Sequence, residues 1–390
     1  LLVAGLTGMT VTGDVFNLYV FLEITGLAAY GMVATGDRAD AAVAALKYLL
    51  IGTIGASLYL LGVGYAFVGT GTLNMADMAE KLAALGYDSP LVLTAFGLVV
   101  GGLVVKIALY PLHTWQPDAY STAPDSVSTL ISALVSTVAA YALARILFSV
   151  FTVDFFLAVP IAQYALLAIA SVSIVAGSLL AVTQTDIQRM LAYSSVSQFG
   201  LVVVGIALAT PIAVVGAIVH LVGHAVMKGG LFAASGIVRR KTGVKSVEEF
   251  DGLADRAPIA AACFAVLSLA MVGVPPAVGF VGKWYIVVGA VRAGQWAVLA
   301  VVLASTLLTL AYFLRLIERM YFTAPDHGAG RDGESEPVGN APVADGGQPA
   351  VSTGMVALIV VASITAVALG LVVPAIESAL QPTLLEVLGL

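Results

Sequence analysis

The chain has 390 residues, of which 60% are hydrophobic and 10% are charged, and its mean hydropathy is +1.03. A soluble globular chain carries about 25% charged residues, so these values exclude a soluble enzyme and indicate a polytopic membrane protein. The net charge of −6 lies in the loops and gives no sign of nucleic-acid binding. The single cysteine, Cys263, cannot form an internal disulfide or hold an iron–sulfur cluster, which takes four cysteines, so we expect no cofactor.

Ten apolar segments are long enough to cross a bilayer, which takes about 20 apolar residues in a helix. We therefore predict an all-α polytopic membrane protein. The chain starts at Leu1 inside an apolar stretch, without Met, and we interpret it as a fragment that lacks its N-terminal part. The predicted spans are 14–35, 41–69, 91–112, 125–150, 157–182, 190–209, 211–238, 258–291, 295–321 and 351–373.

The distribution of lysine and arginine predicts the orientation, because cytoplasmic loops carry an excess of these residues. Four of the 17 basic residues lie within spans: Lys47, Lys106, Lys228 and Lys283. The larger of the two remaining groups marks the cytoplasm and places Asp14 and the C-terminus outside. That group comprises Arg38, Arg189, Arg239, Arg240, Lys241, Lys245, Arg256, Arg315, Arg319 and Arg331, against Lys81, Arg145 and Arg292 on the outer side.

Residues 323–350 are rich in Gly, Pro, Ala and acidic residues and have almost no large apolar side chains. Such a segment cannot bury a core, so we expect a disordered, acidic cytoplasmic loop. It separates the transmembrane helices of 1–322 from a last helix and tail at 351–390. Its acidity is typical of salt-loving organisms, which makes a halophilic archaeon a candidate source.

Two predicted spans carry a lysine beside a helix break. Lys106 is followed by Pro111, and Lys283 follows Pro275-Pro276. Proline removes a backbone donor and clashes with the preceding helical turn, and irregular backbone in a membrane is tolerated only where protein buries it or it lines a wet cavity. The two spans are five apart, so we predict inverted five-helix repeats whose broken helices line a transport path.

Glu23 lies in the middle of a predicted span, where a charged group costs roughly 3 kcal/mol on insertion scales. It is either the ion-pair partner of a buried lysine or a relay group for protons or cations, and the two roles are compatible. Burial disfavours a charged amine, whereas a carboxylate at ~8 Å favours it by roughly 2 kcal/mol at an effective dielectric of ~20. Movement or neutralisation of Glu23 would therefore load or unload the lysine, and we predict that Glu23 and Lys106 act as a coupled pair. Lys47, closer to a span end, fits snorkelling to the surface.

His220, His224 and Lys228 are spaced four residues apart and share one helical face. Two histidines at this spacing can bind zinc, but no Glu follows His220 and a lysine continues the face. Histidine titrates near neutral pH, so we interpret the face as a wet proton-conducting row, with ordinary helix–helix hydrogen bonding as the alternative. Ser194, Ser195 and Ser197 are interpreted individually as helix-packing residues.

Together these motifs resemble the large antiporter-like membrane subunits shared by Mrp-type Na+/H+ antiporters and complex I, and the Mrp D subunit most. The resemblance covers the whole chain. It implies that Asp14, Lys47, His113, Asp118, Asp186 and Arg189 are family-motif residues. The segments that carry it are 12–23, similar to the fifth helix with its acidic Glu23; 106–123, similar to the broken seventh helix; 186–200 and 220–228, similar to two polar family motifs; and 273–283, similar to the broken twelfth helix.

Three positions depart from the family pattern. Gln188 stands where a basic residue is usual, and Gly223 stands where Asn is usual. Thr137 occupies the mid-helix position at which the family usually carries lysine or histidine. The central relay therefore lacks a titratable residue there, and we expect either bridging water held by Ser136 and Thr137, assisted by His220 and His224, or altered conduction.

The resemblance implies a subunit of a multisubunit Na+/H+ antiporter that works with sister subunits in the plasma membrane of a prokaryote. Protons would pass along Glu23, Lys106, His220, His224, Lys228 and Lys283. It implies an ion-transporter subunit rather than an enzyme, with no catalytic residues and no metal. The Thr-Gly-Asp-x-Phe-Asn start favours the antiporter. Two alternatives stay open: a proton-pumping membrane subunit of a complex I-like or membrane-hydrogenase redox complex, and a non-conducting scaffold subunit.

Overall fold

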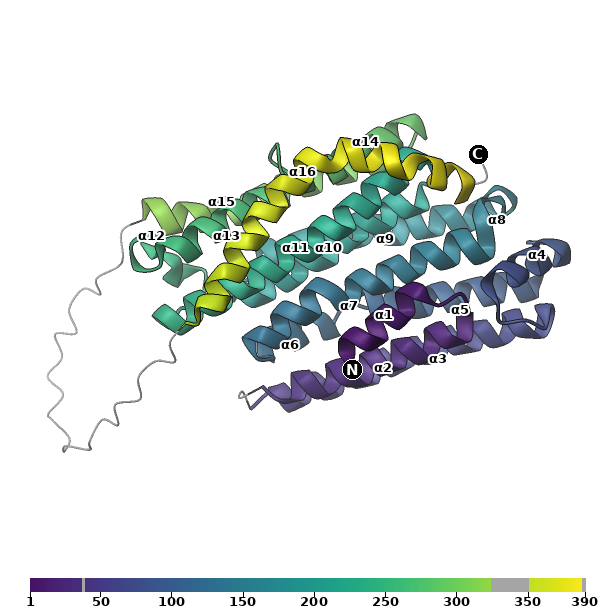
Figure 1. Cartoon of the computed structure of the whole chain (residues 1–390), viewed down its shortest axis with the longest axis horizontal. Helices are drawn as coiled ribbons and strands as arrows, with labels where there is room; N and C mark the ends of the chain where they lie inside the picture. The colour runs from purple at the N-terminus through teal and green to yellow at the C-terminus, as the bar shows by residue number, and fades with distance from the viewer. Residues whose placement is uncertain (37–38, 324–350, 388–390) are drawn as a thin grey trace, which may run out of the picture.

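The computed structural model describes residues 1–36, 39–323 and 351–387. Within these ranges the regular elements are helices, which run side by side along the long axis of the molecule (Figure 1). Nine are long and apolar enough to cross a membrane, and two shorter helices form the halves of a tenth span. The predicted all-helical, multi-span fold is thus confirmed. Arg38, Arg331 and residues 324–350 of the expected loop lie outside the described residues.

Most of the long helices begin and end close to the predicted span limits, but the last helix continues to Val387, past the predicted limit of 373. The first half of the chain forms α1 (Leu2–Val11), α2 (Val15–Ala34), α3 (Ala41–Thr70), α4 (Met75–Leu85), α5 (Pro90–Ile107), α6 (Trp115–Thr122), α7 (Asp125–Ile146), a π-helical turn η1 (Leu147–Phe151) and α8 (Thr152–Ala158). The second half forms α9 (Pro160–Val182), α10 (Ile187–Ala207), α11 (Pro211–Thr242), a 3₁₀ turn η2 (Glu248–Phe250), α12 (Leu253–Arg256), α13 (Pro258–Val272), α14 (Val278–Arg292), α15 (Trp296–Phe322) and α16 (Thr353–Val387).

Both predicted helix breaks are present. α5 ends at Ala108, which has a φ of 67°, and α13 ends at Gly273, which has a φ of 98°. A residue in the left-handed backbone conformation ends a helix. Glycine adopts this conformation readily, whereas alanine adopts it rarely. The chain resumes as α6 after the first break and as α14 after the second. Lys106 lies in the half-helix before the first break, whereas Lys283 lies in the half-helix after the second break.

A matching pair of backbone bridges marks the internal repeat. Asp14, just before α2, pairs with Asn74, just after α3, and Asp186, just before α10, pairs with Ser246, which follows α11. Each residue of the second bridge follows its counterpart by 172 positions (Asp14 to Asp186, Asn74 to Ser246). By the predicted orientation the first bridge lies outside and the second lies in the cytoplasm, as an inverted repeat requires.

α10 is the central helix of the second half. All of its residues except Arg189 and Tyr193 are buried. Glycine permits this close packing: a Cβ at Gly177 of α9 would lie 2.6 Å from the backbone nitrogen of Ser197, and one at Gly200 would lie 2.8 Å from the carbonyl oxygen of Ala170. α16 crosses obliquely over α11, α13 and α14 (Figure 1). The polar side chains of α10 are therefore held away from lipid.

Candidate functional site

The first buried lysine has two side-chain partners, both from α2. Lys106 Nζ lies 3.4 Å from Glu23 Oε1 and donates to the hydroxyl of Tyr30 at 3.1 Å. Lys106 is buried and the Glu23 side chain is 24% exposed. The structure thus brings together the two residues that the sequence analysis paired. Tyr30 was not expected, although it lies two helical turns after Glu23 on the same face.

Aromatic side chains hold the end of α5 in place. The ring of Tyr48 in α3 packs edge-on against Tyr30 at 4.5 Å and stacks on Trp115 of α6 at 4.1 Å between centroids. Trp115 Nε1 donates to the carbonyl oxygen of Val105 at 3.0 Å. This bond gives a second donor to a carbonyl that also accepts from the backbone nitrogen of Ala108 at 3.2 Å, in the last turn of α5, where the regular helical bonds end. The aromatic row therefore stabilises the break beside Lys106.

A buried group of neutral polar side chains joins α6 and α7. Gln116 of α6 donates to the hydroxyls of Tyr120 at 3.2 Å and Ser136 at 3.3 Å, and all three side chains are buried. Thr137, in contrast, is partly exposed, and its hydroxyl donates to Ala133 O in its own helix at 2.7 Å. The structure brings Ser136 into the buried polar row and leaves Thr137 outside it, because consecutive helical residues point in different directions.

The histidine–lysine face of α11 is fully buried. Lys228 Nζ donates to Leu191 O and to Ser194 Oγ of α10, both at 2.7 Å. His220 Nε2 lies 2.9 Å from Gln198 Oε1. Neither ring nitrogen of His224 has a hydrogen-bond partner among the described protein atoms. An imidazole of this kind can exchange hydrogen bonds with water. Ser194 and Gln198 were not expected as partners, and the only sequence signal for them was their polarity inside an apolar helix.

The second buried lysine is held by backbone. Lys283 Nζ of α14 donates to Met271 O at 2.9 Å and Val272 O at 3.0 Å, the last carbonyls of α13. These carbonyls are free because the helix ends there, and their partial negative charge favours a cation. Among the described residues, Lys283 forms no ion pair. The break at 273–277 therefore creates the acceptors that Lys283 uses.

Two ion clusters lie at the cytoplasmic end by the predicted orientation. Asp118 of α6 accepts from Lys47 of α3 at 2.6 Å and from Arg189 of α10 at 2.7 Å. Lys47 was expected to snorkel, and its side chain is indeed 39% exposed, but the structure gives it a carboxylate partner. The cluster thus connects three helices beside the first break.

The second cluster is centred on Asp125, the first residue of α7, which the sequence analysis missed. Its carboxylate accepts from Arg239 at 2.5 Å and Gln188 at 3.2 Å and lies 3.5 Å from Arg240. The Asp125 side chain is 5% exposed. A charge at the start of a predicted span was the available signal. Gln188 donates to the Asp125 carboxylate and accepts from Arg239 at 3.3 Å, so its neutral amide bridges the carboxylate and the arginine.

Three remaining motif residues have local roles in the structure. Asp14 caps α2 by accepting from the backbone of Phe16 and Asn17, and Asp186 caps α10 by accepting from the backbone of Arg189. Such caps satisfy otherwise unpaired helix donors. His113 lies in the first break, buried, with its ring stacked on Tyr110 at 5.2 Å. None of the three contacts the two buried lysines through a hydrogen bond that the structure describes.

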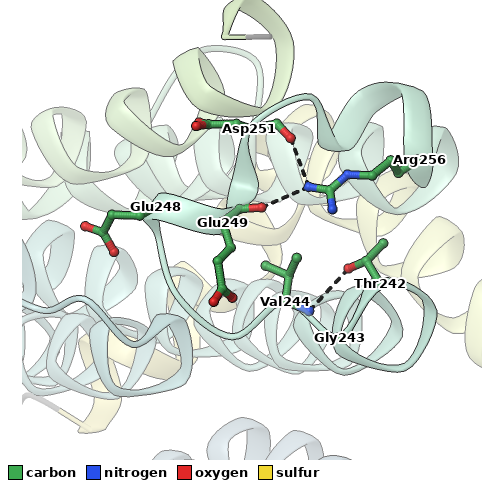
Figure 2. Close-up of a pocket in the computed structure, with 7 residues that line it drawn as sticks. All are labelled: Thr242, Gly243, Val244, Glu248, Glu249, Asp251 and Arg256. Carbon is green, nitrogen blue, oxygen red and sulfur yellow. Dashed lines mark hydrogen bonds between the residues drawn. The ribbon is translucent and has the colours of Figure 1, made fainter. Parts of the chain in front are cut away.

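The loop after α11 encloses an open hollow of about 540 Å³. Figure 2 shows Arg256 donating to the carbonyl oxygens of Glu249 and Asp251, both at 2.9 Å, while Glu248 points away. Glu249 Oε2 accepts from the backbone nitrogens of Lys245 and Ser246, and these two bonds lower the pKa of its carboxyl. The charged groups of the hollow are therefore used to fix the loop, and we assign it no chemistry.

Comparison with known proteins identifies the family. Residues 12–309 match the family model described as NADH:quinone oxidoreductase/Mrp antiporter, TM. The chain belongs to this family. The antiporter-like chain is 48% identical over 327 residues to the N subunit of the NADH-quinone oxidoreductase of Desulforudis audaxviator, covering 84% of this chain and 64% of the relative. It is 31% identical over 318 residues to the D subunit of the Na(+)/H(+) antiporter of Bacillus subtilis, covering 81% and 63%.

A solved structure agrees with this assignment. A chain of the membrane-bound sulfane sulfur reductase, an archaeal respiratory membrane complex, is similar with a TM-score of 0.85 and 31% identity, over 99% of the antiporter-like chain and 74% of that chain. The chain spans less than two thirds of the length of the two subunits compared in the preceding paragraph. The family predicted from the motifs is confirmed, whereas the identities do not support the Mrp D subunit as the best match.

Proposed function

We propose that this chain is a proton-conducting membrane subunit of a redox-linked respiratory complex that resembles complex I. The observation that carries the proton path is the buried row of amines and imidazoles, in which every amine and His220 has a polar partner and the His224 ring nitrogens have none among the described protein atoms. Identity favours the redox-linked complex, at 48% to an N subunit of that kind of complex against 31% to an antiporter D subunit. A subunit of an Mrp-type Na+/H+ antiporter is the second candidate, supported by the family match and by the motif at 12–17.

The proposed path has three parts. Lys106 with Glu23 forms the first, the α11 face with Lys228, His224 and His220 forms the middle, and Lys283 forms the last. Burial disfavours the charged form of each amine, and each amine has partners that partly restore it: a carboxylate for Lys106, and backbone carbonyls for Lys283. Such groups can gain and lose a proton without a large change in free energy, which is what a relay needs.

The central crossing is proposed to run past Gln116 and Ser136 rather than Thr137. Gln116 Nε2 binds Ser136 Oγ, and Gln116 Oε1 has no partner among the described protein atoms. A buried amide and hydroxyl can hold water, which needs ~2–4 polar contacts. Protons would then cross between the halves on water that these neutral groups order, and the absence of a titratable side chain at 137 would not stop conduction.

The setting is proposed from the same observations. The chain would be a multi-pass subunit in the plasma membrane of a prokaryote, assembled with sister subunits, with 1–322 as the conducting region and 351–390 as a last helix and tail. The excess of basic residues supports a cytoplasmic position for the Asp125 cluster and the 239–257 loop. A cysteine at Thr242, in a Cys263→Ala background, should react with a membrane-impermeant reagent only from that side. Labelling from outside intact cells would contradict the orientation.

Proton flux in vesicles that contain the complete complex tests the proposed path. Glu23→Ala should lower the flux about 30-fold, because loss of roughly 2 kcal/mol of pairing energy changes the charge state of Lys106. Glu23→Asp should retain part of the flux. Asp77→Ala, on the exposed face of α4, is the matched control and should leave the flux unchanged. Full flux in the Glu23→Ala complex would remove the pair from the path.

The type of complex can be decided by isolation. A tag on this chain should recover the native complex from membranes. Iron–sulfur subunits and their paramagnetic signals in the isolate would support the redox-linked complex. An isolate of small membrane subunits without iron, together with Na+-dependent proton flux, would overturn that assignment in favour of the antiporter.

A further inference from the structure

Tyr30 is the neutral partner of the first lysine. Its hydroxyl lies 3.1 Å from Lys106 Nζ, closer than the carboxylate of Glu23 at 3.4 Å. The tyrosine is buried, with 4% of its surface exposed. Lys106 Nζ also lies 5.7 Å from the centre of the Tyr30 ring. Two partners of different chemistry therefore come from one helix, seven residues apart.

Two glycines leave the space that the phenol of Tyr30 occupies. A Cβ at Gly52 of α3 would lie 2.1 Å from the Tyr30 hydroxyl oxygen, and a Cβ at Gly26 of α2 would lie 2.9 Å from it. Atoms do not approach this closely, so any side chain at Gly52 would push the phenol aside. The Tyr48 ring closes another side at 4.5 Å. The hydroxyl thus occupies a notch that fits it and points it at Lys106.

The two partners respond differently when the lysine changes charge. An ammonium group has only donors, and an ionised carboxylate has only acceptors, so Glu23 suits the protonated form. A neutral amine has a lone pair that needs a donor. A hydroxyl is both donor and acceptor, so Tyr30 can accept from the ammonium and donate to the amine. It is the one partner of Lys106, among the described contacts, that can serve both forms.

We propose that Tyr30 is a positioning residue that stays bonded to Lys106 in both protonation states and so sets the pH at which this site exchanges its proton. The proposal rests on the proposed proton path. The titratable groups around the amine are Glu23 and Tyr30 from α2, Tyr48 from α3 and, beyond it, Tyr120 from α6. Lys106 forms no other ion pair among the described residues.

The relative strengths of the bonds fix the direction of the effect. A hydrogen bond from a charged donor is stronger than one between neutral groups. Removal of the hydroxyl therefore weakens the protonated form more than the neutral form. The site should release its proton at a lower pH, by about 1 pH unit, which is a tenfold change in proton affinity.

The test is proton flux as a function of pH in vesicles that hold the complete complex. Tyr30→Phe keeps the ring and removes only the hydroxyl. We expect normal assembly, and a midpoint of the flux–pH profile about 1 unit lower than that of the wild type. An unchanged profile would overturn the proposal. Loss of assembly would also overturn it, because the hydroxyl would then be a structural requirement.

A second variant reaches the same group from another helix. Gly52→Ala leaves Tyr30 intact but displaces its hydroxyl, so the midpoint should fall in the same direction. In a Tyr30→Phe background the same alanine should shift the midpoint little further, because the hydroxyl that it would displace is already gone and the nearest remaining ring carbon, Cζ, lies at 2.9 Å rather than 2.1 Å. Gly64→Ala, on the same helix with no atom within 4 Å of its added Cβ, is the matched control and should match the wild type. Independent, additive effects of Gly52→Ala and Tyr30→Phe would contradict the mechanism.

The outcomes separate this inference from the proposed function. If Glu23→Ala keeps full flux, the path itself is wrong and the inference fails with it. If Glu23→Ala lowers the flux while Tyr30→Phe keeps the wild-type profile, the path stands and only the role of Tyr30 is lost.

Discussion

The two halves of the repeat hold their lysines in different ways. Lys106 faces a carboxylate and a phenol on a neighbouring helix, whereas Lys283 is bound by two backbone carbonyls at the end of the preceding half-helix. A carboxylate can change its charge or move away, but helix-end carbonyls are fixed dipoles. The first half therefore has an adjustable partner, and the second half has a constant one.

The same contrast appears on the matching helices α3 and α11. With the shift of 172 positions that relates the two bridges, Tyr48 corresponds to His220 and Gly52 to His224. The first half places an aromatic ring and a notch where the second half places two imidazoles. The same backbone arrangement thus presents an aromatic side chain without a titratable imidazole on α3 and two imidazoles on α11.

The largest expected effect is on the lysine with the constant partner. Lys283→Ala removes the amine of the second break, and among the described residues no carboxylate pairs with it that could take over its role, so proton flux should fall at least ~100-fold. Flux in vesicles with the complete complex measures this. Lys81→Ala, on the exposed face of α4, provides the comparison. Equal flux in wild type and Lys283→Ala would mean that the second half does not conduct.

The connection between the halves can be broken at Asp125. Asp125→Asn leaves Arg239 and Arg240 of α11 without their buried carboxylate, and loss of one partner of a buried pair costs roughly 3 kcal/mol. Thermal unfolding of the purified complex should begin at a lower temperature. Asp77→Asn removes an exposed pair with Lys81 and should cause no measurable change. Similar curves for both variants would show that the cluster does not join the halves.

The central crossing distinguishes two adjacent side chains. Ser136→Ala removes the hydroxyl that Gln116 binds, so flux should fall a few-fold, by the ~1 kcal/mol of a hydrogen bond. Thr137→Val removes a hydroxyl that bonds only its own helix, so its effect should be smaller. A stronger effect at Thr137 than at Ser136 would restore the crossing that the sequence pattern predicts.

The smallest effect concerns the loop that forms the second bridge. The pKa of Glu249 is lower in the fold than in the unfolded chain, so its stabilising bonds are present above the unfolded value of about 4.3 and are lost as the pH falls through the lower folded value. Below about pH 4, the protection of the Lys245 and Ser246 amides against hydrogen exchange, taken relative to the intrinsic exchange rate at each pH, should fall. Glu249→Gln should show faster exchange already at neutral pH, and Glu80→Gln, on exposed α4, should not. Equal protection in wild type and Glu249→Gln would contradict this.

The sequence was sufficient wherever a single residue carries a large free-energy cost in its own segment, whatever surrounds it. Proline and glycine beside lysine marked both helix breaks, because the backbone there loses its helical bonds whatever surrounds it. Glu23 and the His220–His224–Lys228 face stood out because charge and imidazole are expensive in an apolar span. Hydrophobic length alone indicated ten spans, since one bilayer thickness fixes the length of each helix.

Tertiary structure decided which side chains meet. Tyr30 looks ordinary in the sequence, because tyrosine is tolerated in membrane helices without a partner, and the motif gave Ser136 and Thr137 the same bridging role without separating them. Their roles depend on a notch at Gly52 and on an amide at Gln116, which lie on other helices. Thr137 shows the converse: its position in the motif predicted a central role, but its helical direction turns it out of the row. Contacts between distant segments depend on how the helices rotate and pack against one another. The residue types within a single segment do not determine that arrangement.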